Sequence, residues 1–214
     1  MIIRDFMTKN PICVTETTSV TEAKQIMNSN KINKLPVLDG SKRLVGIITK
    51  NDIVKVSPSQ ATTLDMYEIS SLLAKLTCGK FMTKKVITVS ETEVVEEAAR
   101  IMADKNIGCL PVVKDDVVVG IVTESDLFSL MVQMFGAREN GVRANFQQAD
   151  KPGQLAKIFG AVAEQKGNII SVVTRESSET GKRRVTVKVT GISAEKLKEI
   201  LLAAESEIID IRTI

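Results

Sequence analysis

The chain contains the motif Gly-aliphatic-aliphatic-Thr-x-x-Asp twice, at residues 46–52 and at residues 120–126. The polar pairs in these motifs are Thr49 with Asp52, and Thr123 with Asp126. A strand ending before the threonine and a helix starting at it would present free N–H groups and the positive end of the helix dipole, which suits phosphate. A carboxylate in the first turn can accept hydrogen bonds from ribose hydroxyls, as in dinucleotide folds. The pattern therefore predicts nucleotide binding.

The two motifs lie at equivalent places in an internal repeat. Residues 6–53 align with residues 81–127 at a shift of 75, which becomes 74 after the polar turn at residues 39–41, and about 22 of about 47 positions are identical. Each motif follows a Leu-Pro-Val strand at a matching distance. A single Thr-x-x-Asp is better explained by helix capping alone, but the duplication reverses this and favours ligand binding.

Each repeat is predicted to have the order β-α-β-β-α. In the first repeat, residues 12–14 alternate as a short strand would, and a helix starts at Val20 with Ser19 as its cap. Residues 34–38 form a strand, with a proline that favours a sheet edge, and a turn and a returning strand lead to the second helix. Neither repeat alone buries both faces of its sheet well, so the two are expected to share a core.

The repeat with its motif resembles the cystathionine-β-synthase (CBS) domain, and the pair resembles a Bateman module, over about residues 1–135. The resemblance implies that Asp52 and Asp126 hold ribose and that Thr49 and Thr123 lie near phosphate. It also implies that the adenine pocket is lined by the residues before each Leu-Pro-Val strand, which are Ile32, Asn33 and Lys34 in one repeat and Ile107, Gly108 and Cys109 in the other. Only the first set carries a cation, Lys34, so the two sites are expected to differ in ligand or in affinity. The expected ligand is AMP, ADP, ATP, or a molecule of the S-adenosylmethionine or NAD type.

The connector between the repeats, residues 56–80, is predicted to hold an amphipathic helix, because its apolar residues follow helical spacing. These residues are Met66, Ile69, Leu72, Leu73 and Leu76. The helix would cover the core of the module, or alternatively form a dimer contact or a signalling element. This stretch resembles that of AcuB-type acetoin-utilisation proteins, which share the domain order, and the resemblance implies a role in acetoin or carbon catabolism.

The last part of the chain, residues 139–214, is predicted to fold as β-α-β-β-α-β, the ferredoxin-like arrangement. We expect Asp150 to cap the first helix and Gly167 to stop it at the C′ position. The stretch Asp-Lys-Pro-Gly-Gln-Leu at residues 150–155, with Gly-Asn-Ile at residues 167–169, resembles the ACT domain.

The ACT resemblance implies an amino-acid site between two paired copies, at positions Gln148, Asp150, Gly153 and Asn168. Asp150 could pair with an ammonium group, and Asn168 could bond a carboxylate. Serine-binding members of the family usually carry His and Asn where this chain has Gln148 and Asp150, which leaves the amino acid open. The alternative is a dimerising domain that binds no ligand.

Composition excludes several classes of protein. Histidine is absent, which excludes Ser-His-Asp and Cys-His catalysis and His-ligated metal. The three cysteines are widely spaced and no P-loop is present, so we expect no enzyme, no metal and no resident cofactor. A net charge of +3 and 3% aromatic residues make nucleic acid an unfavoured partner. No apolar run approaches membrane-spanning length, and the start of the chain lacks a signal-peptide core, so we expect a cytoplasmic protein.

The sequence therefore predicts a mixed α/β (α+β) chain in four parts: residues 1–55 and 81–138 as CBS repeats, 56–80 as connector, and 139–214 as ACT domain. The predicted function is a non-catalytic, homodimeric sensor of an adenine-containing ligand and an amino acid, which signals to a protein partner. The alternative is a dimeric scaffold without a small-molecule ligand.

Overall fold

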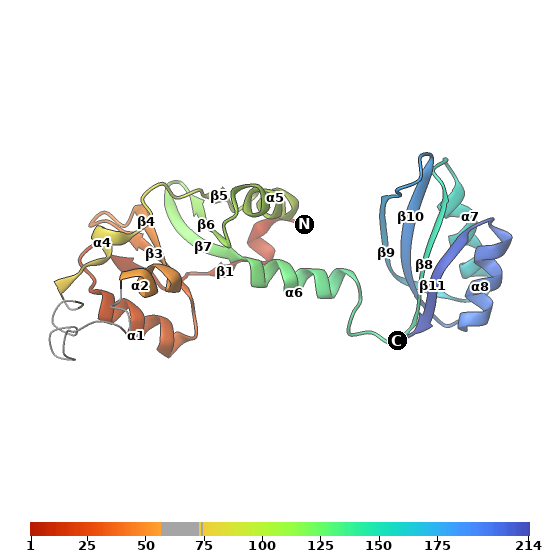
Figure 1. Cartoon of the computed structure of the whole chain (residues 1–214), viewed down its shortest axis with the longest axis horizontal. Coiled ribbons are helices and arrows are strands. Elements are labelled where there is room, and N and C mark those ends of the chain that lie inside the picture. Colours follow the sequence, from red (N-terminus) through yellow and green to blue (C-terminus); the bar gives the residue numbers. More distant parts are fainter. Residues whose placement is uncertain (57–72, 74) are drawn as a thin grey trace. The chain divides into compact units, whose positions relative to one another are not determined.

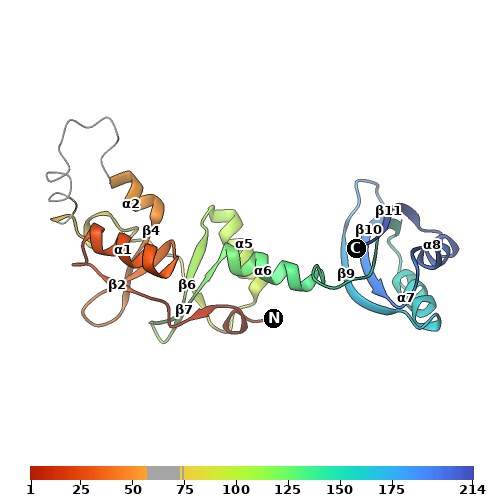
Figure 2. The same cartoon turned by 90° about the horizontal axis from the view of Figure 1, so that it is seen from below.

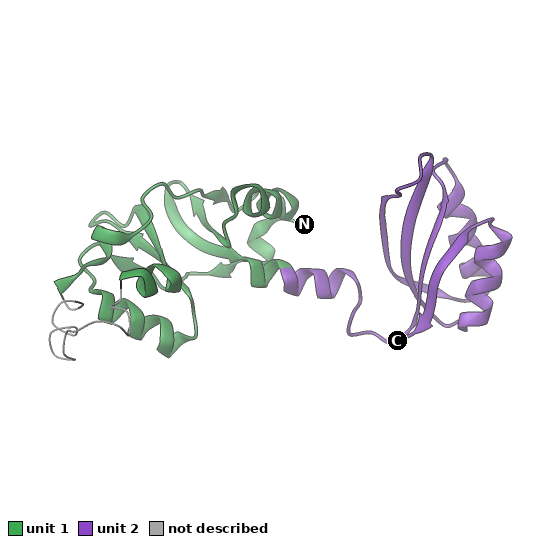
Figure 3. Cartoon of the chain, viewed as in Figure 1, with its two compact units in different colours: residues 1–127 green, residues 128–214 purple. Residues whose placement is uncertain are grey.

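The computed structural model describes residues 1–56, 73 and 75–214. It divides into two compact units, residues 1–127 and residues 128–214 (Figure 3). Most of the predicted connector helix lies outside the described residues, in 57–72 and 74. Each unit has a hydrophobic core of its own.

The first repeat folds as the sequence predicts, with an additional short strand before it (Figure 1). Its elements are the 3₁₀ helix η1 (Ile3–Asp5), β1 (Thr8–Lys9), β2 (Val14–Thr15), α1 (Val20–Asn30), β3 (Lys34–Leu38), β4 (Leu44–Thr49) and α2 (Lys50–Val56). The three strands β2, β3 and β4 form one sheet in that order, with β2 parallel and β4 antiparallel to β3.

From β5 (Val89–Ser90) onward the second repeat has the same strand-helix-strand-strand-helix order as the first (Figure 2). Its elements are α4 (Cys78–Phe81), β5, α5 (Val95–Lys105), β6 (Cys109–Lys114), β7 (Val117–Thr123) and α6 (Glu124–Met134). Its sheet has the strand order β1-β7-β6-β5, so it takes one strand, β1, from the start of the chain.

Local signals explain how α1 begins and how β3 accommodates a proline. The Ser19 hydroxyl accepts a hydrogen bond from the backbone N–H of Glu22 at 3.2 Å, which confirms the predicted cap. The strand β3 lies between β2 and β4 rather than at an edge of its sheet, so that part of the expectation is wrong. Pro36 is tolerated because β2 is short and pairs only with Val37 and Leu38.

The two repeats exchange their leading segments. Thr8 of β1 pairs with Ile121 of the second repeat, and Thr83, its equivalent one repeat later, pairs with Ile47 of the first. The sheet of each repeat is thus extended by the segment that precedes the other repeat. This exchange makes residues 1–127 one unit with a joint interior, and the pattern of hydrophobic residues gives no sign of it.

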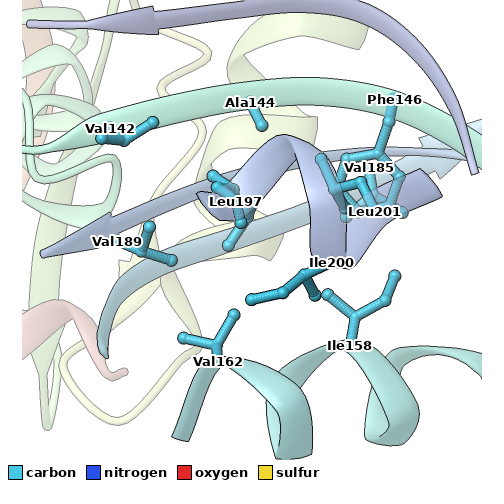
Figure 4. Close-up of a cluster of buried hydrophobic side chains, with 11 residues drawn as sticks. Val142, Ala144, Phe146, Ile158, Val162, Val185, Val189, Leu197, Ile200 and Leu201 are labelled. Atoms are coloured by element: carbon cyan, nitrogen blue, oxygen red, sulfur yellow. The ribbon is translucent and has the colours of Figure 1, made fainter. Parts of the chain in front are cut away.

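The second unit has the predicted β-α-β-β-α-β order, and its core lies between two helices and one face of a sheet. Its elements after α6 are β8 (Val142–Ala149), α7 (Gln154–Glu164), β9 (Asn168–Glu176), β10 (Lys182–Thr190), α8 (Ala194–Ala203) and β11 (Glu207–Thr213). The sheet order is β11-β8-β10-β9, with every pair antiparallel. Figure 4 shows the core side chains, with Phe146 and Val185 from the strands facing Leu201 and Ile158 from the helices.

Two local expectations in this unit are wrong. Asp150 does not cap α7, because the N-cap position is taken by Gly153 in the left-handed region with φ +84°. Gly167 is not the left-handed residue that stops α7, because Lys166 takes that conformation with φ +59°. Gly167 is the next residue, and its N–H donates to the carbonyl of Val162 at 2.9 Å, as in a Schellman motif.

No helix in the described part of the chain is long and apolar enough to cross a bilayer.

Candidate functional site

Both predicted Thr–Asp pairs cap the helices that follow them. The backbone N–H and the hydroxyl of Thr49 donate to Oδ2 of Asp52 at 2.9 and 2.7 Å. The same two groups of Thr123 donate to Oδ2 of Asp126, both at 2.8 Å. The capping geometry thus uses one carboxylate oxygen of each aspartate. In the first repeat the other oxygen, Oδ1 of Asp52, lies 3.7 Å from the exposed ammonium of Lys55.

A cavity of about 370 Å³ lies beside the second of these caps. Its wall combines Thr123 and Ser125 with Ile32, Asn33 and Lys34. The remaining lining residues are Thr8, Asn10, Pro11, Ile12, Asn30, Lys31 and Ile121. The first repeat therefore supplies the predicted adenine-contacting residues, and the second supplies the cap. The strand exchange causes this arrangement, because β1 pairs with β7 directly beside Thr123.

The predicted site residues do not include residues 8–12. One signal could have revealed this segment: the tetrapeptide Phe-Met-Thr-Lys begins both repeats without a change, at residues 6–9 and 81–84. Its threonine is one of the paired residues in both exchanged segments, Thr8 in the cavity wall and Thr83 beside Ile47.

The second predicted set, Ile107, Gly108 and Cys109, lies in a different and more crowded environment. The ammonium of Lys34 donates to the carbonyl of Gly108. A Cβ atom on Gly108 would lie 2.6 Å from Oε2 of Glu124 and 3.1 Å from Nζ of Lys34. Cys109 is buried in a cluster with Ile47, and burial raises the pKa of its thiol, while Lys34 acts in the opposite direction. Lys34, the one cation among the predicted adenine-contacting residues of the first repeat, is thus hydrogen-bonded to Gly108, one of those predicted in the second repeat.

In the second unit, three of the four predicted amino-acid contacts lie at one end of the sheet. Gln148 is the last residue but one of β8 and only 6% of its surface is exposed. Its Oε1 is buried without a hydrogen-bond partner among the described residues. The carboxylate of Asp150 accepts two hydrogen bonds from Arg183, both at 3.1 Å. This guanidinium lowers the pKa of Asp150. Gly153 begins α7 with nothing within 4 Å of its Cβ position.

Asn168 lies at the opposite end of the same sheet. It starts β9 and pairs with Thr190, whereas Gln148 pairs with Arg183 near the start of β10. At about 3.3 Å per strand residue, Asn168 is too far away to touch a ligand held by Gln148 and Asp150 of the same chain.

Two family models match the chain. The CBS domain matches residues 3–59 and 78–133, and the TTHA0829-like ACT domain matches residues 140–212. The ACT match begins at residue 140, whereas the compact unit begins at Phe128 and includes most of α6.

Among relatives with curated names, an L-aspartate semialdehyde sulfurtransferase of Methanocaldococcus jannaschii is 36% identical over 130 residues. The match covers 60% of this chain but only 23% of that enzyme, so this chain spans about a quarter of the length of that relative. A CBS domain-containing protein of Dictyostelium discoideum is 29% identical, covering 63% of this chain and 93% of the relative.

Solved structures with the same fold include two that hold adenosyl ligands. A protein of Vibrio cholerae assigned to acetoin utilization (AcuB) has 30% identity and a TM-score of 0.54, covering 64% of this chain and 95% of its own. The CBS domain pair of protein MJ0100, in complex with 5′-methylthioadenosine and S-adenosyl-L-methionine, has 36% identity and a TM-score of 0.52, covering 65% and 98%. CBSX2 in complex with AMP has 30% identity and a TM-score of 0.50, covering 62% and 96%.

The fold, the duplicated caps and these matches agree with one another. The chain belongs to the CBS-domain family, with tandem CBS domains followed by a C-terminal ACT-like domain.

Proposed function

We propose that this protein is a non-catalytic sensor whose CBS pair binds an adenosyl ligand in the cavity beside Thr123. The observation that carries the proposal is the composition of that cavity. Ile12, Ile32 and Ile121 line the cavity with apolar surface that suits an adenine ring. Asp126 is hydrogen-bonded to Thr123, which lines the cavity, and would supply a carboxylate for ribose hydroxyls. This combination of an apolar wall with a few converging polar groups is typical of small-molecule sites.

The ligands of the neighbouring structures support adenosine as the shared element. S-adenosyl-L-methionine and 5′-methylthioadenosine in one, and AMP in another, differ in charge but contain the same nucleoside. In this chain Lys31 lines the cavity and favours a ligand that carries an anionic group beyond the ribose. Lys34 also lines the cavity, but its ammonium is bonded to Gly108.

We expect the equivalent site beside Thr49 to be weaker. By the symmetry of the repeat its adenine contacts would be Ile107, Gly108 and Cys109. Cys109 instead pairs in register with Thr123. Around Gly108 the ammonium of Lys34 forms a hydrogen bond and the carboxylate of Glu124 lies close by. A ligand would have to displace these side chains, which costs binding free energy.

In the ACT-like domain we propose an amino-acid site that needs two copies of the chain. Gln148, with its unpartnered buried oxygen, and Asp150 would come from one copy, and Asn168 from the other. The ammonium of an amino acid would replace Arg183 as the partner of Asp150, and Gly153 would let the backbone come close to the ligand.

The response would be a shift between two conformations, whose size depends on how differently each binds the ligand. We propose that the shift is passed to a protein partner in the cytoplasm. The similarity to AcuB supports acetoin or carbon catabolism as the process that is regulated. The alternative function, a dimeric scaffold without a small-molecule ligand, does not explain the cavity.

The test compares two matched variants, Asp126→Asn and Asp52→Asn, by isothermal titration with AMP, ATP and S-adenosylmethionine. Both aspartates have the same capping role, so both substitutions affect helix stability alike. We expect Asp126→Asn to weaken binding at least about tenfold, which corresponds to about 1.4 kcal/mol, and Asp52→Asn to change it little.

Equal losses in both variants would show that the effect comes from the caps and not from ribose contacts. If well-folded wild-type protein bound none of the three adenosyl compounds, the sensor proposal would fail and the scaffold would remain.

A further inference from the structure

The sheet of the ACT-like domain has one face that α7 and α8 do not cover. On β8 and β10 the side chains that face the helices alternate with Arg143, Thr186 and Lys188, which point to the other face. Lys188 pairs in register with Arg143 on one side and with Ser171 of β9 on the other. Three strands thus place two cations and a hydroxyl side by side.

The two residues that follow α6, Phe135 and Gly136, are hydrogen-bonded to this face. The Ser171 hydroxyl donates to the carbonyl of Phe135 at 3.2 Å, and the Lys188 ammonium donates to the carbonyl of Gly136 at 2.8 Å. Gly136 has φ +56°, and a Cβ atom there would lie 2.3 Å from Ile170. The chain directly after the helix is therefore fixed to the sheet by its backbone.

Between α6 and the sheet lies a cavity of about 380 Å³. Its sides are apolar, formed by Phe128, Met131, Val132, Phe135, Ala137 and Ile214, and its floor is formed by Arg143, Ser171, Thr186 and Lys188. Phe128 and Met131 are 65% and 51% exposed. The volume is at the lower end of the range for small-molecule pockets, and the exposed apolar surface favours an occupant with an apolar body.

Lys188 indicates that the other end of the occupant carries a negative charge. Its side chain is on the floor of the cavity and only 3% of the residue is exposed. Among the described residues no carboxylate lies within 4 Å of its ammonium, whereas neighbouring Arg143 has Asp210 at 3.2 Å. A buried ammonium that lacks a carboxylate partner has lost hydration without full compensation, so an anion in the cavity would be strongly favoured.

We propose that this cavity binds a small apolar monocarboxylate, whose carboxylate pairs with Lys188 and accepts from Thr186, and whose chain packs against α6. A free amino acid fits less well, because its ammonium would lie beside Lys188 and Arg143. The site is therefore distinct from the amino-acid site proposed at Gln148 and Asp150 and does not depend on it.

The test uses the full chain, with sodium hexanoate as the probe and hexanamide as its uncharged counterpart, in isothermal titration. Hexanoate should bind at least about tenfold more tightly than hexanamide. Lys188→Met keeps the length and burial of the side chain and should remove most of this preference. The matched control is Lys182→Met, on the same strand and the same face, where the lysine pairs with Glu179 and Glu207 instead. It should leave hexanoate binding within about twofold of wild type.

A second variant, Met131→Ala, lies on the exposed side of α6 and should weaken both probes alike, because it removes apolar contact only. Failure of wild type to bind hexanoate, while adenosyl binding is intact, would overturn the proposal without affecting the CBS site. Equal affinity for hexanoate and hexanamide would also overturn it. A third result would also overturn the proposal. In it, sedimentation shows that copies of the chain associate through this face, and Lys188→Met changes this association but not the binding of hexanoate.

Discussion

Methionines from the exchanged segments explain why each of the two motifs begins with glycine, at Gly46 and Gly120. A Cβ atom on Gly46 would lie 2.2 Å from the sulfur of Met82, and one on Gly120 would lie 2.3 Å from the sulfur of Met7. Each glycine thus allows the leading segment of the other repeat to approach the strand. At the residue scale, the motif begins with glycine for packing and ends with aspartate for capping and binding.

This packing can be tested with Gly46→Ala. Met82 is buried and cannot move away freely, so we expect a loss of about 1–3 kcal/mol in the free energy of unfolding, measured by urea denaturation. Gly40→Ala is the control, because nothing lies within 4 Å of its Cβ position, and it should be nearly neutral. In a Met82→Ala background the cost of Gly46→Ala should largely vanish, and an unchanged cost would show that Met82 is not its cause.

At the scale of elements, the backbone conformation of one glycine determines where α7 begins. The helix begins after Gly153 in the left-handed region, although a proline one residue earlier and an aspartate at position 150 would suit a start with a side-chain cap. Asp150 instead bonds to Arg183 across the loop, so its carboxylate is unavailable as a cap. Arg183 lies on β10, so a strand that is distant in sequence positions the carboxylate of Asp150.

Two glycine-to-alanine changes in this element should act in opposite directions. Gly153→Ala should lower the free energy of unfolding by about 1–2 kcal/mol, because alanine resists the left-handed conformation. Gly160→Ala, in the middle of α7, should raise it by about 0.5–1 kcal/mol, because alanine favours helix. Neither Cβ has a neighbour within 4 Å, so packing does not enter. The same sign for both changes, from urea denaturation midpoints, would contradict the assigned conformation of Gly153.

At the scale of the whole molecule, one helix belongs to both units. Residues 124–127 of α6 fall in the first unit and residues 128–134 in the second, and the ribbon changes colour along this helix in Figure 3.

We predict a homodimer, which light scattering at micromolar concentration should report as about twice the 23.3 kDa of one chain. Asp150→Ala and Asn168→Ala should each abolish the response of the protein to its amino acid in a screen of the common amino acids. An equal mixture of the two variants, unfolded and refolded together, should recover part of it, because a mixed dimer has one intact site. No recovery, from protein that is dimeric, would place both residues outside a shared site.

The sequence by itself determined the two repeats, the order of their elements and the ferredoxin-like domain, because hydrophobic periodicity and helix signals such as Ser19 act over a few residues. It also singled out the aspartates and the residues before each Leu-Pro-Val strand. Only the tertiary structure decided which of these residues share a cavity, namely Ile32 with Thr123, and which way Lys34 points. It likewise separated Asn168 from Gln148 and left Lys188 buried beside an apolar cavity. These features depend on strand exchange, register and the docking of α6, which bring together residues far apart in the chain, and no local pattern records them.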